Sequence, residues 1–287
     1  VDAYNIAAKN GYTIVKTRTE FNDIKPGFKR YLVGGEDINS GSDVSNFIDR
    51  KKNDISLADY VKKGIDVLTN DTGFFMMCEG GKIDWFCHAN DIAGMVGEVI
   101  DFDNAIKVAY DFYAKHPDET IIIVTGDHET GGLALGNAYS EYETYASNIK
   151  YQIRTSDSFG KIITSMKLNN KNTSYEMVLD SAKKYFSLGD KIALNPYDSI
   201  RLKHAFDVSF NKLKVSRSES KILYASYEPV SVVCSKLVAE KSGFGWTSFM
   251  HTSMPLPLWA EGKKAEAFET ATDNTQVAKI IFDYLNK

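Results

Sequence analysis

The chain has 287 residues, of which 43% are hydrophobic and 25% are charged, and its formal net charge is -4. This is ordinary globular composition, and the length suits one large domain. With 34 basic and 38 acidic residues and no basic run, the chain is not expected to bind nucleic acid. No apolar run approaches the ~20 residues of a membrane span, and the first residues do not form a signal peptide.

The first part of the chain alternates short strands and helices. Ser56-Leu-Ala-Asp59 is an N-cap motif with Asp59 in place of the usual glutamate, so a helix is expected to begin directly after Ser56. The predicted elements, in chain order, are strands at 13–15 and 31–33, a helix at 57–68, a turn at 70–73 and a buried strand at 74–78.

A helical period then covers residues 92–113, in one or two segments, and Pro117 cannot continue it. Residues 120–124 are apolar and mostly β-branched, which is typical of a central parallel strand. Together with the strand at 74–78, this spacing predicts a right-handed βαβ unit. The expected fold class is therefore α/β, with a mostly parallel central sheet flanked by helices.

The pattern weakens over residues 137–242, where only one clear helix is predicted, at 175–186. We interpret this stretch as a peripheral, insertion-like region of a single domain spanning 1–287, and assign it no chemistry. Beyond it, a strand with a proline-bearing start is predicted at 254–260. Asp273 is expected to open a final amphipathic helix with Val277, Ile280, Ile281 and Leu285 facing inward.

Candidate metal ligands follow the two strongest strand predictions. Glu79, Asp84 and His88 come after the first strand, and Asp127 and His128 come after the second. Ligands in open parallel sheets bind beyond the carboxyl ends of the strands. Asp84 and His88 are four residues apart, so one helical turn places both on one face. A carboxylate oxygen and an imidazole nitrogen placed in this way are a good start for a zinc site.

Glycines are expected to give these segments unusual backbone freedom, at Gly80-Gly81, Gly126 and Gly131-Gly132. Taken alone, His128 would be a surface or capping residue and Glu79 a solvated loop residue. Two strands that both end in acid and imidazole groups favour a metal site, because uncompensated carboxylates at a core edge are costly. His116 and His204 are assigned structural roles.

Three cysteines, Cys78, Cys87 and Cys234, cannot all pair within the chain. Cys87 stands next to His88, so a thiolate ligand is conceivable, but at helical spacing it points away from the face of Asp84 and His88. A Cys78–Cys87 disulfide is open but not favoured.

Three ordered motifs resemble those of the alkaline phosphatase family. They are Glu79-Gly-Gly-x-Ile-Asp84-x-x-x-His88-Ala-Asn-Asp, Thr125-Gly-Asp127-His128-Glu-Thr-Gly-Gly and Gly245-Trp-Thr-Ser-x-x-His251-Thr. The likeness covers roughly residues 1–135 and 243–287 and is diffuse between them.

The resemblance implies a role for each matching position. Asp84, His88 and His251 would hold one zinc, Asp127 and His128 would hold a second zinc, and Glu79 would help to hold a magnesium ion. Trp85 stands where family members carry Lys, His or Trp near the phosphate, which suggests tuning of phosphate affinity and metal preference.

One part of the family pattern is missing from its expected place. The family's nucleophilic serine lies in an Asp-Ser-Ala segment upstream of all these motifs. The Asp180-Ser181-Ala182 run lies downstream instead, inside a helical pattern, and Asp157-Ser158 matches no better. The chain is therefore expected to be the carboxy-terminal half of such a protein, incomplete at its amino-terminal side and inactive alone, with the second zinc site also incomplete.

The function implied by the resemblance is hydrolysis of small phosphate monoesters through a phosphoserine intermediate. A related metallo-hydrolase (a sulfatase, phosphodiesterase or phosphomutase) and a non-catalytic metal- or phosphate-binding module remain open. A periplasmic or extracellular location and a homodimer are expected from the resemblance only.

Overall fold

The computed structural model describes residues 2–27, 29–34, 44–169 and 172–285. Its first part contains α1 (Ala3–Lys9), β1 (Tyr12–Val15), α2 (Arg18–Asp23), β2 (Arg30–Val33), η1 (Phe47–Asp49) and α3 (Leu57–Leu68). The two predicted strands are confirmed and pair in parallel. The predicted helix at 57–68 is also confirmed, with a capping box between Ser56 and Asp59.

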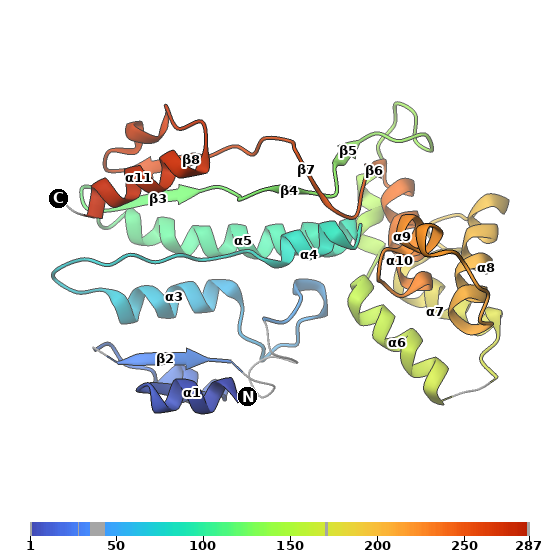
Figure 1. The fold of residues 1–287 in the computed structure, drawn as a ribbon, viewed down its shortest axis with the longest axis horizontal. Helices are drawn as coiled ribbons and strands as arrows, with labels where there is room; N and C mark the ends of the chain where they lie inside the picture. The colour runs from blue at the N-terminus through green and yellow to red at the C-terminus, as the bar shows by residue number, and fades with distance from the viewer. Residues whose placement is uncertain (1, 28, 35–43, 170–171, 286–287) are drawn as a thin grey trace.

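The long axis of the molecule is built around α5 (Ile92–Tyr113), a single continuous helix. Figure 1 shows α3 and α5 running side by side, with the short α4 (Lys82–His88) at one end of α5. Val61 and Ile65 of α3 pack against Ala105 of α5 in one buried cluster. The helix that carries Asp84 and His88 therefore packs against α5, the longest helix in the described part of the chain.

The predicted buried strand at 74–78 is wrong. Phe74 and Met76 do pack against the cluster between α3 and α5, but the alternate side chains Phe75 and Met77 face outward, with Met77 72% exposed. Within the described ranges this segment has no strand partner. An extended apolar segment that packs against helices has the same sequence pattern as a buried strand, because the pattern does not show whether a neighbouring strand is present.

The remaining strands form antiparallel pairs between distant segments. The pairs are β3 (Ile121–Val124) with β8 (Trp259–Gly262), β4 (Glu129–Thr130) with β7 (His251–Thr252), and β5 (Leu133–Leu135) with β6 (Phe244–Trp246). The expected parallel pairing of 120–124, and with it the βαβ unit, is absent from the described residues. The last predicted strand begins at Trp259 instead of 254, since Pro255 and Pro257 cannot donate to a ladder.

Residues 137–242 are far more ordered than their pattern indicates. They form η2 (Ala146–Tyr151), α6 (Ser156–Asn169), α7 (Tyr175–Phe186), α8 (Pro196–Phe210), α9 (Arg217–Tyr224) and α10 (Pro229–Lys241). The predicted helix at 175–186 is confirmed, and the expectation of only one clear helix is wrong. These helices gather at one end of the molecule (Figure 1). They share a buried cluster with Ile92 of α5, and the partly buried Trp246 of β6 packs against it. That the region is an insertion in a single domain stays a prediction.

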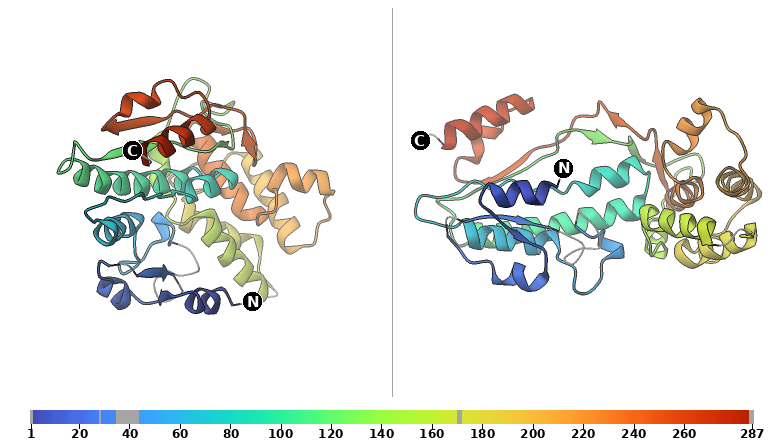
Figure 2. Two further views of the ribbon diagram at one scale, coloured as in Figure 1. Left: turned by 60° about the vertical axis from the view of Figure 1, so that its left-hand side comes forward. Right: turned by 60° about the horizontal axis from the view of Figure 1, so that its bottom comes forward.

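The chain ends in η3 (Ala265–Phe268) and α11 (Asn274–Leu285), which lie with β8 above β3 (Figures 1 and 2). The predicted final helix is confirmed, and Asp273 accepts hydrogen bonds from the backbone at Thr275 and Gln276. Its apolar stripe is only partly buried, because Leu285 is exposed. No helix in the described part of the chain combines the length and apolarity that a bilayer span needs.

Candidate metal centre

Helix α4 brings the first two predicted ligands together. Asp84 and His88 lie one turn apart on the same face, and Nε2 of His88 is 3.4 Å from Oδ1 of Asp84. The i, i+4 prediction for this pair is confirmed.

The third ligand arrives through strand pairing. Thr130 of β4 pairs with His251 of β7, and this pairing carries His251 to α4. Nε2 of His251 lies 3.1 Å from Nε2 of His88 and 3.8 Å from Oδ1 of Asp84. The ligand atoms of Asp84, His88 and His251 all lie within 4.8 Å of one another. We call these three residues the three-ligand cluster.

The chemistry of the three-ligand cluster fits zinc. One carboxylate oxygen and two imidazole nitrogens are a donor set that zinc prefers, and three protein donors leave a position for water or substrate. Nδ1 of His88 lies 2.6 Å from the carbonyl oxygen of Phe249, which can only accept a hydrogen bond. Nδ1 of His88 therefore carries the proton, and Nε2 presents its lone pair toward the cluster.

Thr130 is a site residue that the sequence did not reveal. Its hydroxyl donates a hydrogen bond of 2.5 Å to Oδ1 of Asp84 and lies 3.2 Å from Nδ1 of His128. In the sequence, a threonine before two glycines resembles a turn residue. Its place two residues after His128 is the only feature of the sequence that indicates a role at the metal site. The buried hydroxyl connects the predicted ligands of the two zinc ions.

Asp127 and His128 lie next to the three-ligand cluster. The rings of His128 and His251 stack with centroids 3.5 Å apart and an interplanar angle of 20°. Nε2 of His128 is 3.4 Å from Oδ2 of Asp127, whose side chain is 86% exposed. Among the described residues no third acid, histidine or cysteine completes a group with this pair. Their role at a second zinc stays a prediction.

The glycines contribute in two ways, only one of which was predicted. Gly131 and Gly132 adopt the expected left-handed conformation, with φ of 88° and 60°. Gly80, Gly81 and Gly126 do not adopt a positive φ, so the expected unusual backbone at Gly80-Gly81 is not a left-handed one. These three positions are crowded instead: a Cβ at Gly81 would lie 2.9 Å from Oε1 of Glu79.

Glu79 and Trp85 lie on the solvent side of this region. Glu79 is exposed and directly precedes the turn into α4. Trp85 is 56% exposed, and Nζ of Lys82 lies 5.8 Å from the centroid of its ring. Both side chains are thus accessible to a ligand, although neither belongs to the three-ligand cluster.

Cys87 is not a thiolate. Burial, and after it the nearby carboxylates of Glu129 and Asp84, raises the pKa of the Cys87 thiol to about 12. The three cysteines are free, so a Cys78–Cys87 disulfide is not formed. Among the described residues, Cys87 does not join the group of ligand atoms formed by Asp84, His88 and His251.

The serines in family-like contexts point elsewhere. Ser181 lies within α7 and donates to the carbonyl oxygen of Met177, and Ser158 of α6 donates to Asp49. The two histidines assigned structural roles have local partners. The ring of His116 is tilted against that of Phe112 with centroids 4.6 Å apart, and Nδ1 of His204 lies 2.7 Å from the hydroxyl of Tyr224.

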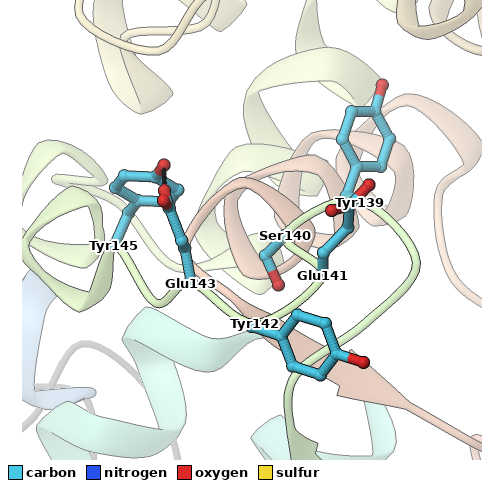
Figure 3. Close-up of a pocket in the computed structure, with 6 residues that line it drawn as sticks. All are labelled: Tyr139, Ser140, Glu141, Tyr142, Glu143 and Tyr145. Carbon is cyan, nitrogen blue, oxygen red and sulfur yellow. Dashed lines mark hydrogen bonds between the residues drawn. The ribbon is translucent and has the colours of Figure 1, made fainter.

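A surface hollow of about 390 Å³ lies on the loop between β5 and η2. Figure 3 shows the side chains that line it: Tyr139, Ser140, Glu141, Tyr142, Glu143 and Tyr145. All six come from one short loop, and none belongs to the three-ligand cluster or its hydrogen-bond partners. The hollow is therefore separate from the candidate metal centre.

Comparison with known proteins shows the family of the chain. The profile of the family described as alkaline phosphatase matches residues 2–286. The chain belongs to the alkaline phosphatase family. It is 32% identical over 239 residues to alkaline phosphatase 3 of Bacillus subtilis, covering 83% of this chain and 46% of the relative. It is 31% identical over 281 residues to alkaline phosphatase 4 of the same organism, covering 96% of this chain and 52% of the relative.

The fold agrees with the same family. The crystal structure of a cold-active alkaline phosphatase from Shewanella sp. superposes with a TM-score of 0.76 at 24% identity, covering 100% of this chain and 63% of that one. An α/β fold like that of an alkaline phosphatase therefore describes this chain. The chain spans about half the length of the curated relatives it matches.

Proposed function

We propose that this chain carries the first zinc site of a metal-dependent phosphomonoesterase. The observation that supports this most strongly is the convergence of Asp84, His88 and His251 from α4 and β7, two elements far apart in the sequence. Family membership supplies the reaction class, hydrolysis of small phosphate monoesters.

The residues of the site would hold the ion and leave one side open. Thr130 fixes the carboxylate of Asp84, and the Phe249 carbonyl fixes the ring of His88, so both donors are oriented before a ligand arrives. When bound, zinc supplies Lewis acidity toward an oxygen of the phosphoester. Trp85, exposed beside Asp84, would line the phosphate side.

The second metal set is a further part of the proposal. Asp127 and His128 would hold a second zinc, supported by the 3.4 Å separation of their side chains and by the stacking of His128 on His251. Glu79 would help to hold magnesium, because it is an exposed carboxylate at the turn into α4. Asp127 and His128 are a partial donor set, so we propose that this second site needs further ligands.

We propose that the nucleophilic serine is neither of the two serines in family-like contexts, Ser181 and Ser158. In the intact protein the reaction would pass through a phosphoserine. Ser181 and Ser158 are bonded elsewhere, so neither is a candidate. We therefore propose that the 287-residue polypeptide alone does not hydrolyse p-nitrophenyl phosphate. Turnover that survives repeated purification and disappears in His251→Ala would contradict this.

A substrate panel on the full-length gene product tests the function. We expect hydrolysis of p-nitrophenyl phosphate well above that of bis-p-nitrophenyl phosphate and p-nitrophenyl sulfate, with loss of activity in His251→Ala. Preference for the diester or the sulfate would assign the chain to a related metallo-hydrolase. No turnover with intact zinc binding would indicate a binding module.

Location and assembly are proposed from the family resemblance alone. We propose export to the periplasm or the extracellular side and assembly as a homodimer. Cell fractionation and sedimentation analysis of the full-length protein check each point separately.

A further inference from the structure

Asn90 links the two halves of the three-ligand cluster. It lies at the junction between α4 and α5, is 1% exposed, and adopts a left-handed backbone conformation with φ of 52°. Its side-chain amide donates to the carbonyl oxygen of Cys87 at 3.0 Å and to that of Ser248 at 2.8 Å. One buried amide therefore joins the last turn of α4 to the loop that precedes His251.

That loop, residues 247–250, places both histidines of the cluster. The carbonyl oxygen of Phe249, one residue after the contact with Asn90, accepts a hydrogen bond from the Nδ1–H group of His88. The carbonyl of Met250 accepts from the backbone N–H of Gly131, and His251 follows directly in β7. A shift of Ser248 relative to α4 would therefore displace the group that orients His88 and the backbone that carries His251.

Resting on the proposed function, we propose that Asn90 is a positioning residue of the zinc site. Its amide fixes the distance between α4, which carries Asp84 and His88, and the loop that delivers His251. Both N–H bonds of the amide are used on backbone carbonyls, so its removal leaves two carbonyl groups without these donors. Groups that orient metal ligands from outside the coordination sphere typically contribute 10–100-fold to metal affinity.

The left-handed backbone of Asn90 also allows its two roles to be separated. Asparagine ends helices in this conformation, and glycine adopts it without strain. Asn90→Gly thus keeps the end of α4 and removes only the side-chain amide. The matched control is Asn137→Gly, since the amide of Asn137 likewise donates to two backbone carbonyls, those of Glu240 and Phe244, but contacts no residue of the cluster.

The test is equilibrium zinc binding by the full chain, measured by competition with a chromophoric chelator, together with the visible spectrum of the cobalt(II) form. We expect Asn90→Gly to lose about 10–100-fold in zinc affinity and to alter the cobalt spectrum. Asn137→Gly is expected to lose stability while retaining wild-type affinity and spectrum.

Wild-type zinc affinity and an unchanged cobalt spectrum in folded Asn90→Gly would overturn the inference, as would an equal loss of affinity in Asn137→Gly. If Asn90→Gly does not fold, Asn90→Ser carries the same test, because a hydroxyl has one donor and leaves at least one of the two carbonyl groups without its hydrogen bond. If the wild-type chain does not bind zinc, both the proposed function and the role of Asn90 are overturned. If the wild-type chain binds zinc and Asn90→Gly binds it equally well, only the role of Asn90 is overturned.

Discussion

Thr130 donates a hydrogen bond of 2.5 Å to the carboxylate of Asp84, and its own backbone pairs with His251. One buried residue thus contacts the carboxylate ligand through its side chain and carries a histidine ligand through its strand. The short β4–β7 pair is therefore part of the metal centre, since it connects ligands that are distant in the sequence.

Removal of this hydroxyl is expected to weaken metal binding. Thr130→Val keeps the shape of the side chain but cannot donate to Asp84, so the carboxylate loses its fixed orientation. We expect zinc affinity to fall by roughly tenfold, measured by chelator competition. Thr164→Val, which removes a hydroxyl bonded only to the Gly160 carbonyl of α6, is the control. Equal affinities for both variants would contradict the assigned role.

Substitution of Trp85 is expected to change the affinity for phosphate without changing the zinc affinity of the three-ligand cluster. Trp85→Lys adds a cation on the exposed side of α4, so inorganic phosphate should inhibit the full-length enzyme several-fold more strongly. Trp85→Ala adds no charge and should not strengthen inhibition. Zinc affinity should stay unchanged in both variants. A loss of zinc affinity in either one would show that Trp85 supports the metal site instead.

The sequence predicted those parts of the molecule that depend on local patterns. Ser56 and Asp59 form the expected capping box, and Asp84 and His88 share the expected helical face. The pairing partner of residues 74–78 is a non-local property, and the apolar pattern alone gave the wrong answer. The role of Thr130 likewise depends on a strand pair that joins distant segments, so no local pattern reveals it.

The helical region shows a different limit. Nine of the 13 residues of α10 are buried, among them Val230, Val232 and Leu237, so its sequence shows no amphipathic helical period. Its β-branched residues resemble a strand more than a helix. Tertiary burial around most of the helix, which the sequence pattern does not encode, determines this element.

Stability of the helical region can be tested at Phe159. This ring is fully buried and meets Phe186 edge to face at 4.8 Å. Phe159→Ala should lower the free energy of unfolding by about 3–5 kcal/mol, measured by urea denaturation. Tyr142→Ala, at a fully exposed position, should change it by less than about 0.5 kcal/mol. Similar values for the two variants would contradict a packed core in residues 137–242.

Lys236 is expected to make stability depend on pH. Burial lowers the pKa of its ammonium group to about 8, Arg201 acts in the same direction, and Glu240 opposes both. Between pH 8 and the ordinary value of 10.5, the unfolded chain binds this proton and the folded chain does not. The contribution of Lys236 to the free energy of unfolding therefore rises with pH across that window. Below pH 8 both states bind the proton, and the burial of the charged ammonium group lowers the free energy of unfolding by its full amount.

The comparison with Lys236→Met isolates this effect. The difference in unfolding free energy between variant and wild type should shift by on the order of 2 kcal/mol in favour of the wild type between pH 7.5 and 10.5. Urea denaturation at several pH values measures it. Parallel pH profiles for the two proteins would contradict the lowered pKa.

The proposed zinc site is best tested by zinc binding to the wild-type chain and to His251→Ala, with His116→Ala as the control. His251 joins Asp84 and His88 only through the folded structure, whereas His116 lies near Phe112 at the end of α5. We expect chelator competition to show a zinc site in the wild type and in His116→Ala, weakened by more than about 100-fold in His251→Ala. Equal zinc affinity in all three proteins, or no zinc binding by the wild type, would contradict it.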